Sequence, residues 1–176
     1  MPQHPVSFEA YPVDRFIDIV KAWIEHPWPI TAAEARQVYE SLGYLVDPED
    51  PEMFASPFAD GEADSYYVTV KGLVSTVDIA VARPCNVGEE KESSAAIASA
   101  YDAFRQAINS HYKNMISATR SEDGSTEWTF TSGVELDVSV WNRSVSARIH
   151  SPYMTQLRRE EKEMGLTSYD DILEDD

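Results

Sequence analysis

Cysteine is nearly absent from this sequence, because Cys85 is the only one among 176 residues. A single thiol excludes an internal disulfide. Without Cys or His pairs at ligand spacing, a structural zinc site is not expected either. No histidine lies near Cys85 in the sequence, which favours an inert thiol over a catalytic nucleophile.

Glycine is also scarce, with seven in the whole chain. None of them belongs to a phosphate-binding loop or to a nucleophile elbow, and the sequence contains no zinc-binding H-E-x-x-H motif. The four histidines fall in four separate predicted elements, and Glu135 and Asp137 are predicted to solvate the outer side of a strand. The sequence therefore predicts no catalytic residue, no cofactor and no metal site.

Basic residues are few: 14 Lys and Arg stand against 31 Asp and Glu, which gives a formal net charge of −17. Most of this charge lies in the segments 47–64 and 160–176, each with a net charge of −7. Such a balance argues against nucleic acid and anionic lipid as partners, since both require patches of Lys and Arg. Either the acidic segments serve solubility alone, or they attract a basic protein.

Long hydrophobic runs are missing as well, and no segment approaches the ~20 apolar residues of a membrane helix. The first residues lack the basic start and apolar core of a signal peptide. We therefore expect a soluble, cytoplasmic protein that does not bind a membrane.

The segment 127–150 contains the clearest pattern in the chain. Apolar residues alternate with polar ones from Val134 to Val140 and again from Val145 to Ile149, as in strands with one wet face. Asn142 and Arg143 lie between the two runs and have the length of a tight hairpin loop. A third strand begins at Trp128. A second pair of strands is predicted at 66–70 and 73–81, with a turn signal at Lys71-Gly72 between them.

Helices are predicted on both sides of these strands. Residues 13–26 carry one apolar stripe, Thr31 and Glu34 form a capping box for a second helix that ends at Gly43, and the longest helix spans about 93–113. A fourth helix covers 152–164. The sequence thus predicts an α+β fold, in which an antiparallel sheet of five to six strands is covered by the N-terminal helical hairpin and the long central helix. Residues 1–12 form an arm, 13–164 a single domain and 165–176 an acidic tail.

Large apolar residues inside the acidic segments are the candidate partner-binding residues. Phe54 and Phe58 stand in the predicted loop 47–64, and Ile172 and Leu173 stand in the tail. The acidic neighbours in the loop complete the candidate set: Asp47, Glu49, Asp50 and Glu52. In the other interpretation, Phe54 and Phe58 attach the loop to the core.

Three stretches carry a resemblance to known proteins: Trp28–Thr31 before a helix ending at Leu42-Gly43-Tyr44, the strand 133–140, and the segment 143–153. Together they resemble a family of small actinobacterial proteins with a domain of unknown function, some of them associated with immunity or secretion. The order of elements is also similar, at the level of the fold, to type III secretion chaperones. The resemblance implies no active-site residue.

These observations favour a non-catalytic protein-binding domain, an immunity-like or secretion-chaperone-like partner of a basic protein. One alternative is a ligand-binding domain or small enzyme with an aromatic pocket lined by Trp28, Trp128, Trp141 and the tyrosines. Another is a structural homodimer. A deep pocket with convergent polar groups would favour the ligand binder or enzyme, and an exposed apolar patch would favour the protein binder.

Overall fold

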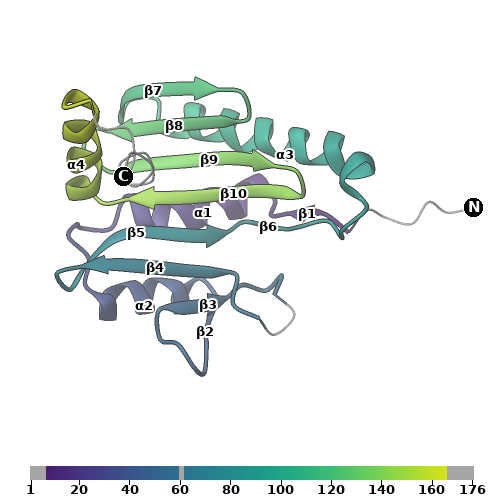
Figure 1. The fold of residues 1–176 in the computed structure, drawn as a ribbon, viewed down its shortest axis with the longest axis horizontal. Helices are drawn as coiled ribbons and strands as arrows, with labels where there is room; N and C mark the ends of the chain where they lie inside the picture. The colour runs from purple at the N-terminus through teal and green to yellow at the C-terminus, as the bar shows by residue number, and fades with distance from the viewer. Residues whose placement is uncertain (1–6, 60–61, 166–176) are drawn as a thin grey trace, which may run out of the picture.

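The computed structural model describes residues 7–59 and 62–165 (Figure 1). It confirms the α+β class, with four helices and one large antiparallel sheet. The helices are α1 (Val13–Ile24), α2 (Ala32–Ser41), α3 (Glu90–His111) and α4 (Pro152–Glu163). The strands are β1 (Glu9–Ala10), β2 (Leu45–Val46), β3 (Met53–Ala55), β4 (Ser65–Val70), β5 (Leu73–Ala80), β6 (Ala82–Arg83), β7 (Ile116–Glu122), β8 (Ser125–Phe130), β9 (Glu135–Trp141) and β10 (Ser144–His150).

The main sheet has eight strands in the order β2-β3-β4-β5-β10-β9-β8-β7. Its centre is the pairing of β5 with β10, which joins the two hairpin systems into one surface. A separate two-stranded sheet pairs β1 with β6, so part of the predicted N-terminal arm is attached to the fold. The main sheet has more strands than the five to six predicted, in part because the three-residue β3 is too short to show an alternation.

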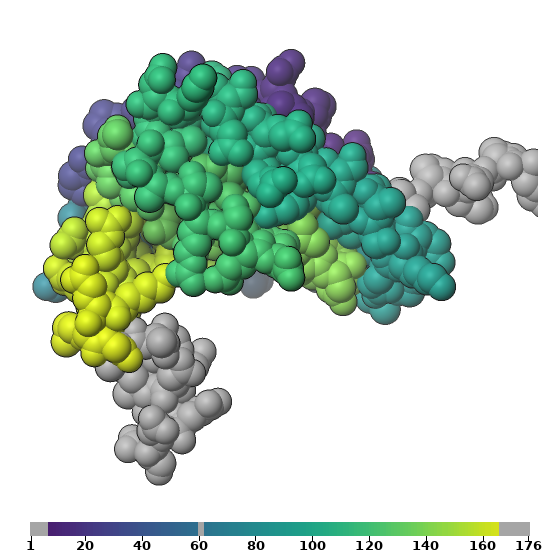
Figure 2. Space-filling view, turned by 90° about the horizontal axis from the view of Figure 1, so that it is seen from above, coloured from purple at the N-terminus to yellow at the C-terminus, as the bar shows by residue number. Residues whose placement is uncertain are grey.

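Helices α1, α2 and α3 lie on one face of the sheet, and α4 projects from the opposite face (Figures 1 and 2). Helix α3 contacts β9 and β10, α2 contacts β5, and α1 packs on α3. We call the face that carries α4 the open face, because α4 covers one end of it only. None of the helices within 7–59 and 62–165 is both long and apolar enough to span a bilayer.

The core lies between the three helices and the sheet. The rings of Phe16 on α1 and Phe104 on α3 stack with their centroids 3.9 Å apart. On the sheet side, Trp128 is fully buried and donates a hydrogen bond from Nε1 to Asn109 Oδ1 (2.8 Å). The alternation seen in the sequence therefore places one face of β5, β8, β9 and β10 in this core, as predicted.

The helix boundaries follow local chemistry. Thr31 Oγ1 accepts a hydrogen bond from Glu34 N (3.2 Å), and the Glu34 carboxylate reaches back to Thr31 N, which confirms the capping box. Helix α3 begins at Glu90, three residues before the predicted start at Ser93. The prediction placed the start too late because the first turn contains no apolar residue that would extend the helical pattern. Acidic side chains in that turn, including Glu90 and Glu92, stabilise the positive end of the helix dipole.

The β4–β5 and β9–β10 turns lie at the residues that the sequence predicted. Lys71 and Gly72 connect β4 to β5 with φ values of 54° and 80°, so both residues occupy the left-handed region typical of a type I′ turn. Asn142 and Arg143 connect β9 to β10. In contrast, the segment 47–64 is not a structureless loop as expected, because β3 forms within it and pairs with both β2 and β4.

Candidate functional site

The acidic side chains predicted to bind a partner form the turn between β2 and β3. Asp47 Oδ1 accepts hydrogen bonds from Glu49 N (2.8 Å) and Asp50 N (3.2 Å), and Asp50 Oδ1 accepts one from Glu52 N (3.0 Å). Asp47 is half-buried, and the three other side chains are exposed. These carboxylates therefore shape the turn through local capping, while most of their charge still faces the solvent.

The two phenylalanines of this region differ from each other. Phe54 is 0% exposed and stacks on Tyr39 with 4.3 Å between ring centroids. Phe58 is half-buried, with its ring 4.5 Å from that of Tyr11 and the Arg83 guanidinium 5.6 Å from its centroid. Phe54 thus belongs to the core and offers no surface to a partner in the folded state. Ile172 and Leu173 lie outside the described residues.

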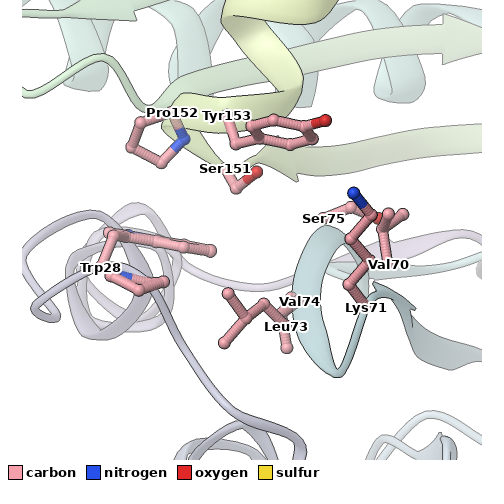
Figure 3. A pocket seen from close by; sticks show the side chains of 10 residues that line it. Trp28, Val70, Lys71, Leu73, Val74, Ser75, Ser151, Pro152 and Tyr153 are labelled. Carbon is pink, nitrogen blue, oxygen red and sulfur yellow. The ribbon is translucent and has the colours of Figure 1, made fainter.

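A pocket of about 410 Å³ opens where three segments meet (Figure 3). The segments are the α1–α2 connection, the β4–β5 hairpin and the beginning of α4, and we call the hollow the Trp28 pocket. Its lining is apolar except for one lysine and two serines. The lining residues are Trp28, Pro29, Val70, Lys71, Leu73, Val74, Ser75, Ser151, Pro152 and Tyr153.

Local sequence features build the walls of the Trp28 pocket. Trp28 stands between two prolines, and its indole Nε1 donates a hydrogen bond to the Trp23 carbonyl oxygen (3.0 Å). The type I′ turn brings Val70 and Leu73 opposite each other, with 38% and 40% of their surfaces exposed. Tyr153 follows the first residue of α4 and is 60% exposed. The pocket therefore presents large apolar side chains that the fold does not bury.

The two serine hydroxyls of the Trp28 pocket already have hydrogen-bond partners within the fold. Ser75 Oγ donates a hydrogen bond to the Val68 carbonyl oxygen (3.1 Å), and Ser151 Oγ accepts one from Met154 N (3.0 Å) as the cap of α4. Across the described ranges, no group of three or more His, Cys, Asp or Glu side chains could hold a metal ion. Such a pocket is suited to an apolar group rather than to acid–base chemistry.

The aromatic pocket suggested by the sequence does not form, because its three tryptophans lie apart. Trp28 lines the pocket, Trp128 is buried in the core, and Trp141 is exposed at the β9–β10 turn. Tyr153 is one of the tyrosines that the sequence interpretation included, whereas Val70 and Leu73 were missed. The available signals were the Pro-Trp-Pro segment and the Lys71-Gly72 turn, but neither reveals that these segments meet.

A second hollow of about 230 Å³, the α4 groove, lies between α4 and strands β7, β8 and β9. Arg158 on α4 reaches down to the sheet and places Nη1 2.7 Å from Glu135 Oε1 and Nη2 3.6 Å from Glu127 Oε1. Glu135 is therefore buried under α4 and does not simply solvate the outer side of the strand as expected. Burial raises the pKa of Glu135, and Arg158 opposes this effect.

His150 lies directly opposite Glu135 in the β9–β10 pairing and is also buried. Its Nδ1 is 3.4 Å from Thr76 Oγ1. Burial, together with the positive charges of Arg158 and Arg148, lowers the pKa of His150 to about 3. The ring is therefore neutral at physiological pH, and its position on the open face beneath α4 is structural.

We expect the His150 ring to make the protein sensitive to acid. Below pH 6.5 the unfolded chain binds a proton at His150, whereas the folded protein does so only near pH 3. This contribution to stability is complete above pH 6.5 and is lost progressively as the pH falls. Between pH 7 and pH 5 the parent should lose about 2 kcal/mol of unfolding free energy relative to His150→Gln. Urea denaturation at both pH values measures the difference, and equal losses in the two proteins would contradict it.

Comparison with known proteins gives one match. A family model described as "Family of unknown function (DUF6301)" matches residues 14–151. This range includes most of the lining of the Trp28 pocket and ends at the cap of α4. No curated protein and no solved structure matches the chain.

Proposed function

This chain belongs to the DUF6301 family of unknown function, and we propose that it is a non-catalytic protein-binding domain whose Trp28 pocket receives an apolar side chain of a basic partner. The observation that supports the proposal is the exposure of Val70, Leu73 and Tyr153 around one hollow whose serine hydroxyls already have partners. An immunity-like or chaperone-like role is the form of this function that we favour.

The chemistry of the pocket supports an apolar anchor. Large side chains that remain exposed together on a folded surface are typical of interaction sites, because their burial against a partner releases water from apolar surface. In protein interfaces, a few such buried anchors supply most of the affinity. Lys71 also lines the pocket, and a lysine contributes apolar surface through its aliphatic stem.

The charge of the chain supports a basic partner. With a net charge of −17, the protein attracts cations from solution, and the exposed side chains of the β2–β3 turn, such as Glu49 and Asp50, contribute to that field. Electrostatic attraction of this kind accelerates association and is screened over ~8–10 Å at physiological ionic strength. In this proposal the Trp28 pocket supplies most of the affinity for the partner, and the acidic surface increases the rate at which the partner associates.

The volume of the pocket supports a second candidate. A hollow of about 410 Å³ falls within the range of sites for small organic ligands. Because its lining offers few polar groups to orient a substrate, this candidate is an apolar small molecule that is bound and not transformed.

A displayed library of random peptides tests the main proposal. We expect selection on the parent protein to enrich peptides with one large apolar side chain flanked by Lys or Arg. The double variant Leu73→Ser, Tyr153→Ser should bind the selected peptides at least tenfold more weakly than the parent, a difference of about 1.4 kcal/mol in binding free energy. Leu45→Ser is the matched control, because Leu45 is 71% exposed but lies on β2, outside the pocket lining. Titrations at low and high salt measure the electrostatic part.

Several outcomes would contradict the proposal. Equal binding by the parent and the double variant would remove the Trp28 pocket from the interface. Selection of no peptide, together with a small apolar molecule retained through purification, would favour the ligand-binding candidate. Selection of no peptide by a protein that is dimeric at micromolar concentration would favour the structural homodimer.

A further inference from the structure

The α4 groove combines charges and hydroxyl groups that the protein-binding proposal does not use. Thr155, Arg158, Arg159 and Lys162 all line it from the helix side. Their spacing of i, i+3, i+4 and i+7 places them on one face of α4, turned toward the sheet. On the sheet side the groove is lined by residues of β7, β8 and β9, including Arg120 and Thr129.

Two of the four basic side chains are already paired. Arg158 binds Glu135 and Glu127, and Arg120 Nη2 lies 2.7 Å from Glu122 Oε1. In contrast, no carboxylate of the described residues lies within salt-bridge distance of Arg159 or Lys162. The groove lining holds four basic and three acidic side chains, so its formal charge is +1 in a chain whose net charge is −17.

An unsatisfied hydroxyl lies in the same groove. Thr155 is 5% exposed, and its Oγ1 has no hydrogen-bond partner among the described residues. A buried hydroxyl without a partner costs about 1–3 kcal/mol, so native proteins rarely retain one that no ligand or water satisfies. Thr155 lines the groove on the same helix face as Arg159 and Lys162, so its hydroxyl is a donor beside the groove that the described part of the fold leaves unused.

We propose that the α4 groove binds a small oxyanion, the carboxylate or phosphate group of a metabolite, between the Thr155 hydroxyl and the cationic side chains of Arg159 and Lys162. Charge-assisted hydrogen bonds from Arg and Lys to such oxygens are stronger than neutral ones. A groove of about 230 Å³ limits the ligand to a small molecule.

The acidic residues of the groove narrow the ligand class further. Glu127 and Glu135 are held by Arg158, whereas the carboxylate of Glu161 has no cation within salt-bridge distance among the described residues. A ligand that carries a hydroxyl or amino group beside its oxyanion would satisfy Glu161 and avoid a repulsive contact. The site is thus suited to a hydroxy acid, an amino acid or a small phosphate ester.

Titration of the full ¹⁵N-labelled chain tests the proposal, with sodium phosphate and sodium succinate as separate probes at constant ionic strength. We expect amide shifts concentrated at residues 155–162 and around Arg120 and Thr129. Stronger shifts with phosphate than with succinate would assign the site to phosphate esters, and the reverse order would assign it to carboxylates. Shifts that appear equally with sodium chloride alone would overturn the proposal.

Variants separate binding from folding. Arg159→Gln with Lys162→Gln should raise the dissociation constant of the preferred probe at least tenfold. Arg105→Gln is the matched control, because Arg105 is a half-buried helical arginine that pairs with Asp102 on α3, outside the groove lining. Thr155→Val should weaken binding three- to tenfold without lowering the melting temperature, since it removes a hydroxyl that has no partner within residues 7–59 and 62–165. If both groove variants bound the preferred probe as tightly as the parent does, the α4 groove would not be the binding site.

Discussion

Replacing Trp23 by alanine should lower the free energy of unfolding by about 3–5 kcal/mol, the range for large aromatic truncations in protein cores. Trp23 is fully buried on α1 and packs edge-on against Tyr39 of α2, with 4.9 Å between ring centroids. The substitution leaves a cavity between the two helices of the N-terminal hairpin. The remaining side chains are in a close-packed interior and can fill this cavity only in part.

Two further variants give the Trp23 experiment its controls. Trp23→Phe should lower the free energy of unfolding clearly less than Trp23→Ala does, because phenylalanine fills most of the space. It also removes an indole N–H that has no partner among the described residues. Trp141→Ala should change stability by less than about 1 kcal/mol, since Trp141 is exposed at a hairpin turn. Urea denaturation measures all three, and an unchanged midpoint for Trp23→Ala would show that this helix face is not in the core.

Replacing Phe54 by alanine should have a similar effect, with a loss of about 3–5 kcal/mol. The sequence offered two interpretations of this residue, as an anchor for a partner or as an attachment to the core. In the structure its ring is stacked on Tyr39, whose hydroxyl donates toward the carbonyl oxygens of Asp78 (2.7 Å) and Tyr66 (2.9 Å). Phe54 thus links β3 to α2, and its loss should also loosen the acidic turn that precedes it.

Phe58→Ala is the matched control for Phe54. Phe58 belongs to the same acidic segment but is only half-buried, so its truncation should cost about 1 kcal/mol. Thermal and urea denaturation of both variants decide between the two interpretations. If Phe54→Ala kept the stability of the parent and lost peptide binding, the partner-anchor interpretation would stand and the core assignment would fail.

The two proposed binding surfaces share one element. The beginning of α4 supplies Ser151, Pro152 and Tyr153 to the Trp28 pocket, and the rest of the helix supplies the cationic face of the α4 groove. Arg158 attaches the helix to the sheet through Glu135. Any substitution that displaces α4 should therefore affect both surfaces, whereas Leu73→Ser and Lys162→Gln should each affect one.

The sequence by itself determined the secondary structure where a pattern repeats over several residues. The alternation from Val134 to Val140 located β9, the Thr31–Glu34 box located the start of α2, and the Lys71-Gly72 pair located a hairpin. These features depend on backbone geometry and on neighbours within a few residues, so they are visible locally. The strand β3 was hidden, because three residues are too few to show an alternation.

The position of the Trp28 pocket, and the burial of the side chains under α4, depend on the tertiary structure. Trp28, Leu73 and Tyr153 are distant in the sequence and meet because β5 pairs with β10, which brings the α1–α2 connection, the β4–β5 turn and the start of α4 to one end of the sheet. Helix α4 covers Glu135 and His150, so both are buried. The alternation in the sequence places both on the strand face that was predicted to face solvent. A side chain's exposure depends on what lies across from it in space, and the local sequence pattern carries no information about that neighbour.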